Sequence, residues 1–134
     1  MRTRGAIVLG GGRSSRMGTD KLALLLDGRP LLARAVDAAW AWADAVVVAG
    51  DRPDGWAGAE RTVFRREDPP FGGPVAGIAA ALAELGALDE VLILAGDLAD
   101  PAAVVALLAA SGTGPDGVVL EDDEGWPQYL AGRY

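Results

Sequence analysis

The segment Leu9–Lys21 of this 134-residue chain combines three consecutive glycines with two arginines and one lysine. The glycines, Gly10–Gly12, follow the short apolar run Ala6–Leu9, which is the pattern of a buried strand that enters a loop. Glycines let the backbone turn sharply and bring bare N–H groups against a ligand, and such groups of amides bind anions. The cationic side chains add countercharge, so the segment predicts an anion site.

Two phosphate-binding motifs do not fit this segment. The pattern G-x-x-x-x-G-K-[ST] does not occur, and a dinucleotide fingerprint counted from Gly10 has Ser15 at its third glycine position. A plain strand-to-loop turn is the alternative explanation. Lys21 favours a ligand, because the chain has eleven arginines and a single lysine. Lysine is a compact point charge suited to one phosphate oxygen, whereas arginine is a planar fork.

A second candidate is Asp97, which follows the apolar run Glu90–Ala95 and one glycine. In open parallel sheets ligands bind beyond the carboxyl ends of the strands, so we expect Gly10–Gly12 and Asp97 to line one crevice. A carboxylate that faces phosphates needs a bridging cation, and Mg²⁺ serves this purpose. The alternative role, a helix cap, suits Asp100 better, because Asp100 directly precedes Pro101.

Composition excludes several chemistries. Without Cys or His the chain has no thiol nucleophile, Ser-His-Asp triad, zinc finger, iron–sulfur cluster or disulfide. Any metal must sit on carboxylates, carbonyls and water. The net charge of −7 argues against a nucleic-acid groove. The apolar runs are too short for a membrane span or a signal peptide, so we expect a cytoplasmic protein.

The elements that must position these residues alternate between strands and helices. This alternation predicts an α/β fold with a mainly parallel sheet and helices on both faces, and the length predicts one domain over residues 1–134. The expected strands are Ala6–Leu9, Val46–Val48, Arg61–Phe64, Glu90–Ala95 and Val118–Leu120, and the expected helices are Pro30–Trp40, Val75–Leu85 and Pro101–Ala110.

The opening segment resembles the signature L-A-G-G-x-S-x-R-M-G-x-x-K of the molybdenum cofactor guanylyltransferase family, a branch of the α/β nucleotidyltransferases. Gly10 stands where alanine is usual. The family's G-P-L-A-G element appears as Gly73–Gly77, a glycine-proline loop that feeds a helix N-terminus, and its metal-binding aspartate appears as Asp97. A structural turn is the alternative for Gly73–Gly77. The resemblance covers about positions 6 to 100 and extends more loosely to Tyr134.

This resemblance implies a Rossmann-like three-layer sandwich of the nucleotide-diphospho-sugar transferase type, shortened at the C-terminus. It implies a magnesium site at Asp97 and catalytic roles for Arg16, Lys21 and Asp97. An aspartate before the G-P-L-A-G element should contact the nucleotide; Asp68 is the candidate, with Arg66 or Glu67 as alternatives. The implied nucleotide-binding residues are Leu9, Gly10, Gly11, Gly12, Lys21, Asp68 and Asp97.

The implied activity is a Mg²⁺-dependent transfer of GMP from GTP to molybdopterin with release of pyrophosphate. An asparagine that the family often shows is replaced by Ala49-Gly50-Asp51, so CTP remains an alternative nucleotide and a sugar phosphate an alternative acceptor. Family members continue past the segment that Gln128–Arg133 matches. The chain is thus a fragment, a minimal fold or one part of an assembly, and a homo-oligomer or a non-catalytic nucleotide-binding module stays open.

Overall fold

The structure is a computed structural model that describes residues 3–10, 25–26, 29–50, 52, 56, 58, 60–65, 74–96, 100–110, 117–121 and 127–134. Eight strands and three helices lie in this part of the chain. In chain order they are β1 (Arg4–Leu9), β2 (Leu25–Leu26), β3 (Arg29–Pro30), α1 (Leu31–Trp40), β4 (Ala45–Ala49), β5 (Val63–Arg65), α2 (Pro74–Leu85), β6 (Glu90–Ala95), α3 (Pro101–Ala110), β7 (Val118–Glu121) and β8 (Pro127–Arg133).

Six of these strands form one sheet in the order β5-β4-β1-β6-β8-β7, while β2 and β3 form a separate antiparallel pair. Strands β5, β4, β1 and β6 run parallel, and β8 runs antiparallel to both of its neighbours. The central strands are continuous apolar runs because helices cover both of their faces. The prediction of a mainly parallel α/β sheet is therefore confirmed.

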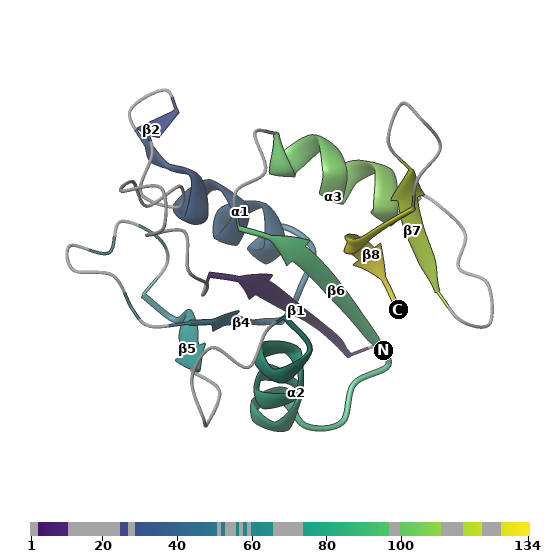
Figure 1. Cartoon of the computed structure of the whole chain (residues 1–134), viewed down its shortest axis with the longest axis horizontal. Coiled ribbons are helices and arrows are strands. Elements are labelled where there is room, and N and C mark those ends of the chain that lie inside the picture. Colours follow the sequence, from purple (N-terminus) through teal and green to yellow (C-terminus); the bar gives the residue numbers. More distant parts are fainter. Residues whose placement is uncertain are drawn as a thin grey trace.

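Helices α1 and α3 cover one face of this sheet and α2 covers the other (Figure 1). Successive side chains of a strand point to opposite faces, so β1 and β4 contribute to both hydrophobic cores. Val8 and Val48 pack in the core under α1 and α3, whereas Ile7 and Val47 pack in the core under α2. The result is the expected three-layer sandwich.

Several boundaries shift by one or two residues, as at β1, which begins at Arg4 instead of Ala6, and three further differences are informative. Pro30, predicted to open a helix, pairs with Leu25 in the β2–β3 hairpin, and α1 begins one residue later. The third strand begins at Val63, two residues later than predicted. Strand β8 was not predicted. Each difference depends on pairing with another segment, which local hydrophobic periodicity does not encode.

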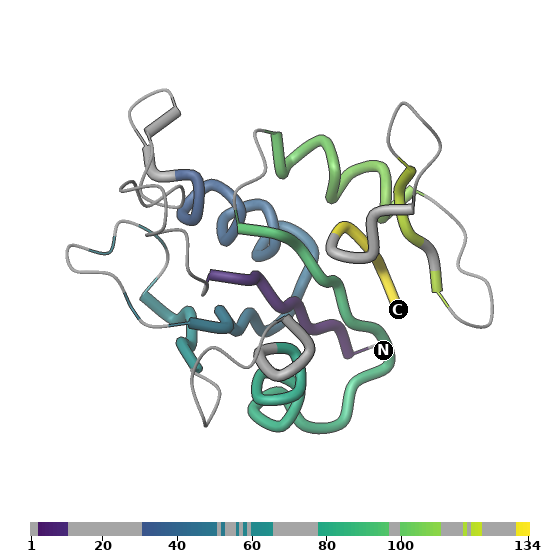
Figure 2. Tube along the Cα trace, in the orientation of Figure 1, coloured from purple at the N-terminus to yellow at the C-terminus, as the bar shows by residue number. Residues whose placement is uncertain are grey.

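Both ends of the chain attach to the start of β6 (Figure 2). The backbone N–H groups of Asp89 and Glu90 donate to the carbonyl oxygen of Thr3 at 3.0 and 3.2 Å. Tyr134 and Val91 exchange two backbone hydrogen bonds of 2.8 and 2.9 Å. Within the described part of the chain, no helix is long and apolar enough to cross a bilayer.

Candidate functional site

Three neighbouring parallel strands each end in a glycine at the same edge of the sheet. Gly10 follows β1, Gly50 follows β4 and Gly96 follows β6. Backbone hydrogen bonds extend the sheet to these glycines, since Gly10 N–H donates to Ala49 O at 3.2 Å and Gly96 N–H donates to Leu9 O at 3.1 Å. Because glycine lacks a side chain, the strands end at this edge in bare main chain.

The edge between β1 and β6 is also where the strand order reverses. From β1 the chain proceeds to β4 and β5 on one side, and α2 then leads it to β6 on the other side. Ligands of open α/β sheets bind in the crevice at such a switch point. Leu9 and Ala95 are register partners there. The chain therefore departs toward residues 11–24 and toward residues 97–99 from neighbouring positions.

The segment that contains Asp68 departs from a third position on the same edge. Strand β5 ends at Arg65, the register partner of Ala49, and Gly50 N–H donates to Arg65 O at 2.9 Å. This exit lies two strands away from β1, a separation of about 10 Å at the usual strand spacing. The described strand ends before the first loop and before Asp97 are thus neighbours, and the strand end before Asp68 lies one strand beyond β4.

Of the predicted nucleotide-binding residues, Leu9 and Gly10 lie within the described residues, at the switch point. The roles of the others stay predictions, and so does the magnesium site at Asp97. Among the residues that the structure describes, no group of three or more acidic side chains could hold a metal. The predicted site residues outside the described part are Gly11, Gly12, Arg16, Lys21, Asp68 and Asp97, together with the alternatives Arg66 and Glu67.

Asp100 caps helix α3, as predicted. Its Oδ1 atom accepts a hydrogen bond of 3.2 Å from the backbone N–H of Ala103. A side-chain oxygen that accepts from the third helical N–H is the standard N-terminal cap, and Pro101 occupies the first helical position, where proline is favoured. The cap of α3 therefore does not require Asp97.

Gly10 is closely surrounded by the core beneath α1. A Cβ atom at this position would lie 2.6 Å from Val48 Cγ1 and 3.3 Å from Leu32 Cδ1. Carbon atoms in contact lie about 3.5–4.0 Å apart, so alanine does not fit here without movement. The departure of Gly10 from the alanine of the signature therefore has a packing reason, which no local sequence pattern indicated.

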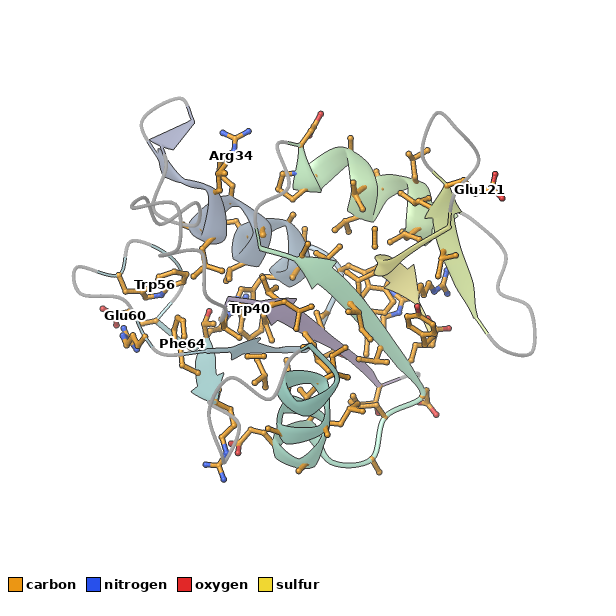
Figure 3. All side chains as sticks on the ribbon, in the orientation of Figure 1. Arg34, Trp40, Trp56, Glu60, Phe64 and Glu121 are labelled. Carbon is orange, nitrogen blue, oxygen red and sulfur yellow. The ribbon has the colours of Figure 1, made fainter. Side chains whose placement is uncertain are left out.

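The aromatic residues near β5 belong to the core. Trp56 and Phe64 meet edge to face with ring centres 5.0 Å apart, and Trp40 Nε1 donates to Thr62 Oγ1 at 2.9 Å (Figure 3). Trp40, Trp56 and Phe64 pack against the core beneath α1, as does Trp42. Trp40, Trp42 and Trp56 therefore serve packing, and Trp126 lies outside the described residues.

An open, mainly parallel sheet with glycines at its switch point defines an α/β domain of the doubly wound type. Comparisons with known proteins narrow this class to the nucleotidyltransferases. Residues 6–134 match the family model described as the MobA-like NTP transferase domain, and the chain belongs to this family. The recognition made from the opening signature is thereby confirmed.

Named relatives agree with this assignment. The chain is 39% identical over 97 residues to a probable molybdenum cofactor guanylyltransferase of Synechococcus elongatus, a match that covers 69% of this chain and 50% of that protein. It is 34% identical over 137 residues to the molybdenum cofactor guanylyltransferase of Rhizobium johnstonii, covering 93% of this chain and 64% of that protein. The chain thus spans between half and two thirds of the length of these relatives.

A solved structure has the same fold. Molybdopterin-guanine dinucleotide biosynthesis protein A from Archaeoglobus fulgidus superposes with a TM-score of 0.62 at 22% identity, over 97% of this chain and 66% of that one. At this identity the likeness concerns the fold. It supports the three-layer α/β architecture and again leaves about a third of the longer chain unmatched.

Proposed function

We propose that the chain transfers GMP from GTP to the terminal phosphate of molybdopterin and releases pyrophosphate. The observation that carries the proposal is the family match over residues 6–134, combined with the position of its opening signature. Leu9 and Gly10 begin that signature and lie at the switch point beside Gly96. The names of the relatives supply the nucleotide and the acceptor of the proposal.

The proposed reaction requires no protein nucleophile. An oxygen of the acceptor phosphate attacks the α-phosphorus of GTP, the bond between that phosphorus and the bridging oxygen to the β-phosphate breaks, and pyrophosphate leaves with the electron pair. The chain contributes orientation and charge compensation. A sequence without His or Cys can carry out this chemistry.

Each predicted residue has a role in this proposal. The backbone N–H groups of Gly11 and Gly12 would receive the nucleotide beside the main chain of Leu9 and Gly10, because the N–H of Gly10 already donates to Ala49 O. Lys21 and Arg16 would offset the charge that develops on the phosphates. Asp68 would contact the nucleotide from the β5 side of the sheet. Helices α2 and α3 follow the parallel strands β5 and β6, so their N-termini would add a favourable potential for anions at this edge.

Magnesium is the cofactor in the proposal. The ionisable metal ligands of this chain are carboxylates, since it lacks His and Cys, and oxygen ligands are the ones that Mg²⁺ prefers. Asp97 would hold the ion, because it follows the buried Gly96 at the switch point and the cap of α3 is supplied by Asp100. Bound Mg²⁺ would neutralise charge on the triphosphate.

The experiment is a pyrophosphate-release assay with the 134-residue chain, GTP or CTP, and molybdopterin or a sugar phosphate. We expect release with GTP and molybdopterin in the presence of Mg²⁺. If pyrophosphate is released with CTP and not with GTP, the nucleotide in the proposal is CTP. If it is released with a sugar phosphate and not with molybdopterin, the acceptor in the proposal is a sugar phosphate. GTP binding by calorimetry without release from any pair would identify a non-catalytic module.

Asp97→Ala tests the site within the same assay. We expect the variant to lose both activity and its response to Mg²⁺, because the proposed metal ligand is gone. Asp100→Ala is the matched control, since its carboxylate is used by the helix cap at the same edge. Activity that still depends on Mg²⁺ in Asp97→Ala would place the metal elsewhere.

A further inference from the structure

Gly10 lies against two buried core side chains that have little room to move. Val48 is fully buried and Leu32 is 2% exposed, and both side chains approach the position where a Cβ of residue 10 would lie. Val48 lies in β4, where it is the register partner of Val8 in β1. Because its side chain is β-branched, its χ1 angle is restricted. Its Cγ1 methyl therefore fixes how far the backbone at residue 10 can sink toward α1.

The same backbone is held from the side by the sheet. Gly10 N–H donates to Ala49 O, the carbonyl next to Val48 in the chain. One residue of β4 thus supplies the steric limit and the next supplies the hydrogen bond. Together they determine the position of the main chain where it leaves β1 at Gly10.

We infer that Val48 is a positioning residue for the nucleotide site and acts through its contact with Gly10, an inference that rests on the proposed function. An added methyl group at residue 10 would have to move by about 1 Å to reach normal contact distance. A displacement of this size in a group that orients substrate costs on the order of 10²-fold in rate. Removing methyl groups from Val48 would restore the space.

The experiment compares Gly10→Ala, Val48→Ala and the double variant. Gly10→Ala should raise KM for GTP and lower kcat/KM on the order of 10²-fold, because displaced backbone amides meet the phosphates poorly. The double variant Gly10→Ala/Val48→Ala should regain most of this loss, since the new methyl fills part of the vacated volume. All constants are measured below the unfolding midpoint of every variant.

Val46 provides the matched control. It lies in the same strand and the same core as Val48 and is 1% exposed, but its register partner is Ala6, four residues before Gly10. Val46→Ala should therefore fail to rescue Gly10→Ala. Equal rescue by Val46→Ala, or an unchanged KM in Gly10→Ala, would overturn the inference.

A urea-unfolding cycle separates this inference from the proposed function. The stability losses of Gly10→Ala and Val48→Ala should be non-additive, and those of Gly10→Ala and Val46→Ala should add. A wild-type chain that binds GTP but releases no pyrophosphate would refute the proposed function, and the KM comparison would then be made with GTP dissociation constants. Additive stability losses at residues 10 and 48 would refute the packing contact itself.

Discussion

At the amino ends of the parallel strands, charged and aromatic side chains tie the elements together, whereas at the carboxyl ends three glycines meet through backbone hydrogen bonds. Arg133 of β8 pairs with Glu90 at the start of β6, and both side chains are only 8% exposed. At the other end of β6, Gly96 N–H bonds to Leu9 O. The same strand thus begins in a buried ion pair and ends at the switch point.

The ion pair also holds a helix. Arg133 Nε and Nη2 donate to the two oxygens of Glu90 at 2.8 and 3.0 Å, and Nη1 donates to the carbonyl oxygens of Leu108 and Ala109 at 3.2 and 3.5 Å. A cation at the last carbonyls of α3 is favoured by the helix dipole. The ring of Trp42 lies beside the same guanidinium group, 5.8 Å from its Cζ.

Other contacts at this edge are of the same kind. Asp89 Oδ2 accepts a hydrogen bond of 2.7 Å from Thr3 N–H, and Asp44 Oδ2 accepts one of 3.1 Å from Arg4 N–H. The difference between the two edges teaches that side-chain contacts secure the sheet at the edge where no ligand is expected, while backbone hydrogen bonds between strand ends and glycines close the opposite edge. Substitutions at the two edges should therefore affect different quantities.

Arg133→Ala should have the largest effect and should act on stability. Removing Arg133 takes away both hydrogen bonds that its guanidinium donates to the buried carboxylate of Glu90, and breaking a buried ion pair costs about 3–5 kcal/mol of unfolding free energy. Urea unfolding checks this. The double variant Arg133→Met/Glu90→Met should recover much of the loss, because it leaves no unpaired buried charge. If Arg133→Ala is as stable as the wild type, the contacts at the amino ends of the parallel strands do not secure the sheet.

Lys21→Ala should act on turnover instead. Losing one preorganised charge at the phosphates should lower the rate about 10²-fold or more, with the urea midpoint unchanged. Lys21→Arg is the control for charge alone, and it should restore only part of the rate because its planar fork differs from a point charge. Unchanged turnover in Lys21→Ala would remove the nucleotide role from this segment.

Asp100→Ala should have the smallest effect, and it sharpens the comparison because Asp100 lies at the site edge without being part of the proposed site. Losing the cap of α3 should cost about 1 kcal/mol of unfolding free energy. Thermal unfolding measures this loss, and Asp100→Asn should retain most of the stability. A large fall in turnover in Asp100→Ala would mean that the cap also organises residues 97–99.

Much of the fold could be predicted where a short stretch of sequence identifies the element by itself. The run Glu90–Ala95 and the proline-led run Pro101–Ala110 coincide with β6 and α3, because their apolar content and boundary residues leave few alternatives. The Asp100 cap was likewise evident from its neighbour Pro101. Strand β8 escaped prediction because antiparallel pairing defines it, with β7 just before it in the chain and with the distant β6.

The sequence by itself determined which chemistry is open to this protein and where strands give way to glycines. Those properties follow from residue types and short-range spacing, which can be read directly from the sequence. Tertiary structure alone decided that the glycines after β1, β4 and β6 share one edge, that Val48 limits residue 10, and that Arg133 meets Glu90 across 43 positions. Such contacts depend on strand order and register, which arise only when segments far apart in the chain bury their apolar faces together.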